Sequence, residues 1–498
     1  MRTSTQRPTF ATLESCSSRW PARRVLVLPA LPVQRRRAFV VLALLVLEMS
    51  GLGVATVLAS GAANGESLSK QTAALKAAVR AKELESAQEL TSALVQHGDP
   101  KAFGAIFEHA LSGRFFELEP HASRLLSAVT DPKAREEILR QAREHPNYKT
   151  RILLLRVAGG WASESPEALV AVHDVLKGKK ANVILAALKI LRELKRPESA
   201  TPVMELLEAR GGKGGSRKRK AKSRVYFDAL DVLKAVTGKD FKRLEEWKAY
   251  LKTHGGKAPA KAKKPRKKGR GRTAAYKAPA DFFDIPVNSD RVMFILDISH
   301  SMLIADPYLP GDGPEKPNAR TEAARPKNAG RGGRGTSGAG STPSAERVRL
   351  RRAQNELVRV IQSLDGGIRF GVMAFNHEMH FWQGSPRLRE ATRTNKSSAA
   401  LWVQNLTATG WTRTDRVLES ALSVSGADTF YVLTDGAPQG RDNRRLAVAP
   451  ILEYVGFENR FRLARVHTVS FAQIRDNRMR YLVDQLAKEN DGKSVYLK

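Results

Sequence analysis

The stretch that decides the fold is Val292-Met293-Phe294-Ile295-Leu296-Asp297-Ile298-Ser299-His300-Ser301. Its five leading apolar residues run without a polar break, which is typical of a strand buried on both faces of a sheet. An aspartate and two serines follow at alternate positions, and an extended turn points alternate side chains to one side. Hard oxygen ligands of this kind suit Mg²⁺. The stretch therefore predicts a buried strand whose carboxyl end carries a cation site.

Two later segments supply further oxygen atoms. Residues 428–436 form a second apolar strand that contains Asp435 near its end, and residues 409–414 form a loop with Thr412 ahead of a helical segment. Together with the first stretch, they resemble the metal-ion-dependent adhesion site of a von Willebrand factor type A (VWA) domain. The resemblance implies that Mg²⁺ or Mn²⁺ is bound by Asp297, Ser299, Ser301, Thr412 and Asp435.

Three points at this site stay open. His300 stands where many family members have glycine; because it is not a ligand position, the departure concerns the loop conformation. Thr414 competes with Thr412 for the threonine position, although Thr412 keeps better register with the helix predicted at 417–422. An unmetallated, hydrogen-bonded loop is the competing interpretation of the whole set.

Residues 281–498 alternate strands and helices, so we expect a doubly wound, Rossmann-like α/β VWA domain with a mainly parallel sheet. Its ligands then lie at the carboxyl ends of the strands. A disordered insertion, 303–343, separates the metal loop from a helix at 345–364, whose arginines are predicted to form its solvated side: Arg347, Arg349, Arg351 and Arg352. The other predicted elements are strands at 368–375, 378–383, 466–471 and 494–497 and helices at 397–406, 446–457 and 478–489.

Residues 66–253 predict a helical domain, because apolar residues recur at three- and four-residue spacing, first in a run from 75 to 95. Residues 151–176 and 184–208 superimpose at an offset of about 33 residues and resemble HEAT-like helical repeats. Such repeats stack into a solenoid and bind partners on a concave face. A plain helical bundle is the alternative.

The 498-residue chain has a net charge of +34, which is concentrated in three tracts, 213–224, 252–277 and 320–352. We expect a basic loop at 211–224 and a flexible basic linker at 254–280. Such tracts attract nucleic acid or an anionic membrane surface in a salt-dependent way. A solvated, charged linker is the simpler interpretation.

The amino-terminal region predicts a targeting segment. Residues 1–37 are basic and predicted to be disordered, and the apolar run 38–59 is about as long as the roughly 20 residues that cross a bilayer. With arginines ahead of it, this run predicts a signal peptide or a transmembrane helix, and hence a membrane-anchored, secreted or periplasmic protein. The single cysteine, Cys16, precedes the run, so the remainder can form no internal disulfide and no thiolate zinc site.

We therefore expect a non-enzymatic protein whose metal site binds an acidic residue of a partner protein, with no small-molecule substrate. Hydrolysis by the same ion is the enzymatic alternative, but only His300 and Asp306 lie near it in sequence as candidate bases. Two other hypotheses are a cytoplasmic VWA accessory protein of an AAA-type ATPase and a polyanion-binding protein that uses the basic tracts.

Overall fold

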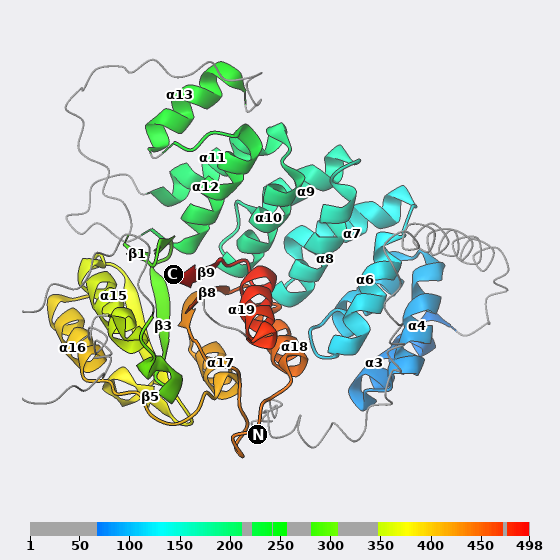
Figure 1. Cartoon of the computed structure of the whole chain (residues 1–498). Helices are drawn as coiled ribbons and strands as arrows, with labels where there is room; N and C mark the ends of the chain where they lie inside the picture. The colour runs from blue at the N-terminus through cyan, green and yellow to red at the C-terminus, as the bar shows by residue number, and fades with distance from the viewer. Residues whose placement is uncertain are drawn as a thin grey trace, which may run out of the picture. The chain divides into compact units, whose positions relative to one another are not determined.

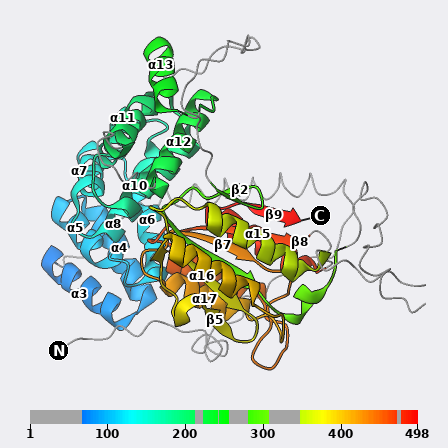
Figure 2. The same ribbon diagram turned by 90° about the vertical axis from the view of Figure 1, so that its left-hand side faces the viewer.

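The structure is a computed structural model that describes residues 67–211, 222–241, 243–255, 280–306, 347–471 and 476–497. The chain divides into two compact units, residues 1–137 and 138–498, and both are drawn in Figures 1 and 2. The expectations for 1–37 and 38–59 lie outside the described residues, as do most of the basic loop 211–224, the linker 254–280 and the insertion 303–343.

The prediction of a transmembrane helix is not borne out by the described residues. Within these ranges, no helix is both long and apolar enough to cross a membrane. The longest helix of this part of the chain has 15 residues, Arg349–Ser363, against the roughly 20 that a bilayer requires. The segment for which the helix was predicted, 38–59, lies outside the described residues.

The first unit is helical, as predicted. Its helices are α3 (Leu68–Ala81), α4 (Leu84–His97), α5 (Pro100–Ala105), which continues as a π-turn over Ile106–Ala110, and α6 (Glu119–Ser127); α7 (Pro132–Glu144) crosses the boundary between the units. The helical run expected from 75 to 95 is divided in two. Lys82 adopts a left-handed conformation with φ of 59°, and its N–H donates to the Ala78 carbonyl, which ends α3.

The second unit begins with further helices: α8 (Tyr148–Trp161), α9 (Pro166–Val175), α10 (Ala181–Leu194), α11 (Ala200–Gly211), α12 (Arg224–Thr237) and α13 (Leu244–His254). Each helix packs on more than one neighbour, because α8 packs on both α9 and α10, and α12 packs on both α10 and α11. The approach of α8 to α10 is close at Gly159, where an added Cβ would lie 2.9 Å from Ile190 Cγ2. A helical region therefore precedes the sheet, as predicted, while the HEAT-like type of repeat stays a prediction.

The sheet of this unit is built from parallel strands in its centre. Its strands run in the order β5-β4-β3-β7-β8-β9, and β6 also pairs with β4. The strands, with a separate hairpin of β1 and β2, are β1 (Asp281–Phe282), β2 (Ile285–Pro286), β3 (Arg291–Asp297), β4 (Arg369–Phe375), β5 (Met379–Phe381), β6 (Arg389–Glu390), β7 (Thr429–Leu433), β8 (Arg465–Phe471) and β9 (Ser494–Leu497). Because β3 pairs in parallel with both β4 and β7, the carboxyl ends of these three strands meet at one edge. The doubly wound, mainly parallel sheet is thus confirmed.

Helices cover both faces of the sheet. They are α15 (Arg349–Ser363), α16 (Arg393–Gln404), α17 (Thr414–Ser423), α18 (Val448–Asn459) and α19 (Asn477–Glu489). Figure 1 shows α15 and α16 on one side and α17, α18 and α19 on the other. The hairpin β1–β2 and the short strand β6 were not predicted from the sequence, because two-residue strands leave no alternating pattern to detect.

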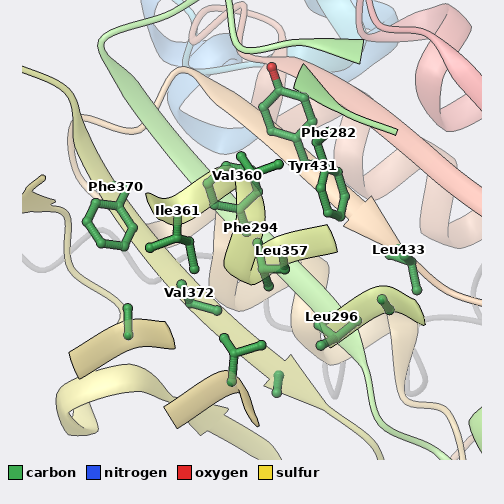
Figure 3. Close-up of a cluster of buried hydrophobic side chains, with 14 of the residues drawn as sticks. Phe282, Phe294, Leu296, Leu357, Val360, Ile361, Phe370, Val372, Tyr431 and Leu433 are labelled. Carbon is green, nitrogen blue, oxygen red and sulfur yellow. The ribbon is translucent and has the colours of Figure 1, made fainter. Parts of the chain in front are cut away.

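The core on the α15 side combines alternate residues of the strands with the apolar stripe of that helix, as Figure 3 shows. Phe294 of β3 stacks on Tyr431 of β7 with ring centroids 5.3 Å apart. Phe282 of the β1–β2 hairpin packs edge-on against both rings, and the Tyr431 hydroxyl donates to the Pro286 carbonyl over 2.7 Å. The hairpin therefore closes one end of the core.

A buried charge cluster connects α10 and α12 to the sheet within the second unit. Asp491, in the turn before β9, accepts hydrogen bonds from Arg192 of α10 and, over 2.9 Å, from Arg465 of β8. Arg465 also pairs with Asp228 of α12 over 2.9 Å, and Asp228 lies 3.4 Å from Arg224 of the same helix. Burial alone would raise the pKa of Asp491, but Arg465 and Arg192 hold it well below its usual range. The helices are therefore fastened to the sheet by ionised groups.

Candidate metal centre

Asp297, the last residue of β3, lies at the base of the predicted site and is fully buried. Its Oδ1 accepts from the Ser299 backbone N–H over 2.8 Å, and its Oδ2 accepts from the Thr434 hydroxyl over 2.6 Å. Burial, followed by the charge of Asp435, raises the pKa of Asp297 to about 7. A second carboxylate this close favours a bound cation or a proton.

Two hydroxyls connect the Asp297 loop to the end of β7. The Ser299 and Ser301 hydroxyl oxygens lie 3.0 Å apart, and the Ser301 hydroxyl donates to Asp435 Oδ1 over 2.6 Å. Because β3 and β7 are parallel neighbours, their ends bring these side chains together, although Ser301 and Asp435 are 134 positions apart in sequence. The structure therefore gathers four of the five predicted ligands through direct hydrogen bonds.

Thr412 joins this group from the loop 409–414. Its backbone exchanges hydrogen bonds with Gln439, since Thr412 N–H donates to Gln439 Oε1 over 3.1 Å and Gln439 N–H donates to the Thr412 carbonyl over 2.8 Å. A Cβ added to Gly436 would collide with the Thr412 hydroxyl. That hydroxyl therefore lies against the residue that follows Asp435. The competing residue, Thr414, is the first residue of α17 and is as buried as Thr412, so burial does not separate the two.

The conformation of the first loop accommodates His300 without strain. Residues 300–303 form a short 3-10 helix, and His300 is not among the described residues with positive φ. Its N–H donates to the Gly410 carbonyl over 2.9 Å, and the Thr409 N–H donates to the Ile298 carbonyl over 2.9 Å. The Asp297 loop and the loop 409–414 therefore support each other, so a glycine is not required at position 300.

The structure adds one residue that the sequence interpretation placed wrongly. Arg349, predicted on the solvated side of its helix, is buried at the first position of α15. Its Nη1 donates to Asp435 Oδ2 over 2.7 Å, and its Nε donates to Asp306 Oδ1 over 3.1 Å. The sequence does contain a signal for this buried position. Arg349 precedes Ala353 by four residues and Leu357 by eight, so it lies on the same side of the helix as the apolar stripe.

Asp306 is likewise not a surface residue. It is buried and pairs with both Arg349 and Arg352. One oxygen of its carboxylate accepts from Arg349 and the other from Arg352. His300, the other candidate base, has an exposed side chain. The expectation that the site is not catalytic stays a prediction.

The donor set is consistent with a hard divalent ion, because three hydroxyls and two carboxylates converge at a buried edge. Only two of the five predicted ligands are acidic. Accordingly, within the described ranges, no group of three or more His, Cys, Asp or Glu side chains is placed to hold a metal. The buried pair Asp297 and Asp435 is the feature that calls for a cation, and Arg349 supplies part of that charge.

Among known proteins, the chain finds its similarities in solved structures. No protein-family model matches the sequence, and no curated protein matches it. Among solved structures, the chain is similar to a von Willebrand factor type A protein from Catenulispora acidiphila, with 15% identity and a TM-score of 0.29. The similarity covers 43% of this chain and 40% of that one. The strand order and the three loops described above are compatible with a VWA-like α/β fold.

Proposed function

We propose that this protein is a non-enzymatic binding protein whose VWA-like domain holds Mg²⁺ or Mn²⁺ and uses it to bind an acidic residue of a partner protein. The observation that supports this most directly is the hydrogen-bonded group of Ser299, Ser301 and Asp435 above the buried Asp297. These residues, with Thr412, would hold the ion. When bound, it would supply an electrophilic position for an external carboxylate.

The charges around the site support an anionic partner. Three carboxylates, Asp297, Asp306 and Asp435, face two guanidinium groups, Arg349 and Arg352, which leaves one net negative charge when all are ionised. A divalent ion reverses this to one net positive charge. A single carboxylate from a partner would then neutralise the site, whereas a cationic side chain would be repelled.

We propose that the helical region contributes a second protein-binding surface. The packing of α8 on both α9 and α10 agrees with HEAT-like stacking of helices. A repeat array of this kind presents a continuous surface to partners.

Isothermal titration of the full chain with Mn²⁺, and then Mg²⁺, tests the metal site. We expect saturable binding that falls at least about tenfold in Ser301→Ala, because a ligand and its bond to Asp435 are lost together. Ser423→Ala is the matched control, since its exposed hydroxyl bonds only within α17, to the Ser420 carbonyl, in the described structure. Absence of saturable binding by the unmodified protein would refute metal dependence.

Binding to immobilised poly-L-glutamate tests the partner class and separates it from a second candidate function. The net charge of +34 favours polyanion binding through the basic tracts. Metal-dependent binding should disappear with EDTA and in Ser301→Ala. Binding that is unaffected by EDTA but falls steeply between about 50 and 200 mM salt would instead support the polyanion function.

A further inference from the structure

We propose that Arg349 is the built-in counter-cation of the metal site and that it competes with a divalent ion for Asp435. The inference rests on the proposed function, because it concerns the same site. It assigns to this arginine the role of a positioning residue that sets the affinity of the site for metal and holds Asp435 in place without one.

The contacts of Asp435 carry the argument. One oxygen of its carboxylate accepts from Ser301, and the other accepts from Nη1 of Arg349. The Asp435 side chain has no solvent exposure, and that of Arg349 is only 7% exposed. Both oxygens are therefore engaged by the protein in a place where water cannot substitute for either donor. An approaching ion must share this carboxylate with a fixed positive charge.

Arg349 cannot easily turn away, because three other groups hold it. Its Nε donates to Asp306, and its guanidinium carbon lies 5.0 Å above the ring of Phe471 at the end of β8. The backbone is fixed as well: Arg349 N–H donates to the Ile304 carbonyl over 3.0 Å, directly after the Asp297 loop. A guanidinium held this rigidly acts as a permanent part of the site rather than as a mobile surface charge.

The consequence is a site that is ordered in the absence of metal and has reduced affinity for it. Replacing Arg349 by a neutral residue removes the competing charge, so metal should bind more tightly. The same replacement leaves the buried Asp435 without its partner, so the metal-free protein should become less stable. An ion pair with a structural role alone would lower the stability of the metal-free protein without raising its affinity for metal.

The test measures Mn²⁺ affinity by calorimetry and thermal unfolding in EDTA for Arg349→Gln, Arg349→Lys and the control Arg359→Gln. Arg359 belongs to the same helix, but its side chain is exposed and pairs with Glu356. We expect Mn²⁺ to bind about tenfold more tightly to Arg349→Gln. Arg349→Lys, which keeps the charge, should remain near the affinity of the unmodified protein, and Arg359→Gln should change it by less than about threefold.

The outcomes distinguish this inference from the proposed function. Unchanged Mn²⁺ affinity in Arg349→Gln, together with loss of binding in Ser301→Ala, would overturn the competition and leave the metal site standing. Binding by neither the unmodified protein nor Arg349→Gln would refute both metal binding and competition. In that case, thermal unfolding in EDTA tests the Arg349–Asp435 ion pair by itself. Adding Asp435→Asn to Arg349→Gln should restore part of the stability that Arg349→Gln loses, and additive losses would refute the ion pair. If Arg349→Gln fails to fold, the affinity of Arg349→Lys decides, because a shift of tenfold or more would contradict a charge-based role.

Discussion

Replacing Asp491 by Asn should destabilise the second unit strongly, because this carboxylate is the centre of the buried charge cluster. Its side chain is 21% exposed, whereas those of Arg224 and Arg465 are 3% and 7% exposed. The substitution removes the charge-assisted hydrogen bonds that Arg192 and Arg465 donate to this carboxylate. Water cannot fully compensate at such low exposure.

The expected loss of stability depends on the ion pairs that remain after the substitution. Two charged hydrogen bonds contribute about 1.5–3 kcal/mol each, and breaking a buried pair typically costs about 3–5 kcal/mol. Arg465 keeps Asp228 at 2.9 Å, and Arg224 keeps the same carboxylate at 3.4 Å. We therefore expect a loss near the lower end of that range, about 3 kcal/mol.

Urea unfolding of the full chain, followed by tryptophan fluorescence and circular dichroism, measures this loss. Asp442→Asn is the matched control, because its pair with Arg444 is exposed on both sides, at 59% and 88%, and such surface pairs contribute about 0–1 kcal/mol. The pKa of Asp491 is depressed, so its contribution is present above the ordinary aspartate range and is lost as the pH falls below it. A change in Asp491→Asn no larger than in Asp442→Asn would refute the role of the cluster.

Three further predictions concern the same unit. Burial, with help from Arg465, lowers the pKa of His467 well below its usual value. As the pH falls, the unfolded chain therefore takes up a proton before the folded chain does, and the free energy of unfolding should fall by up to about 1.4 kcal/mol per pH unit below about pH 6.5. Urea unfolding at about pH 7.5 and 5.5 should show a smaller loss of stability in His467→Gln than in the unmodified protein. Gly436→Ala should lower Mn²⁺ affinity at least about tenfold in calorimetry, since the new Cβ displaces Thr412; wild-type affinity would place this threonine outside the site. Phe294→Ala should cost about 3–5 kcal/mol in the same unfolding assay, against less than about 0.5 kcal/mol for the exposed Leu401→Ala; equal losses would contradict the proposed core.

Most of the secondary structure was predictable because its signals are local. Apolar runs of five and four residues identified β3 and β7, and three- and four-residue spacing identified the helices on either side. The breaks were harder to predict. Lys82 ends α3 in a left-handed conformation that lysine seldom adopts, and nothing in the flanking pattern marks it.

The candidate site divides in the same way. Asp297, Ser299 and Ser301 are close in sequence, so their grouping follows from the geometry of an extended turn. Asp435 and Thr412 were placed beside them through a resemblance. The parallel pairing of β3 with β7 explains the position of Asp435, and the hydrogen bonds of residues 409 and 410 to the first loop explain that of Thr412. The proximity of all five is now a property of the structure, while the bound ion is a proposal.

By itself, the sequence determined the order of helices and strands, the buried strand that carries Asp297 and the spacing of its oxygen donors, because these depend on neighbours a few positions away. Only the tertiary structure decided which charges are buried and paired. Arg349 contacts Asp435 across 86 positions, and Arg224 contacts the Asp428 carbonyl across 204. A basic residue carries the same charge on a surface and in a core, so its partner becomes known only when packing removes the water around it.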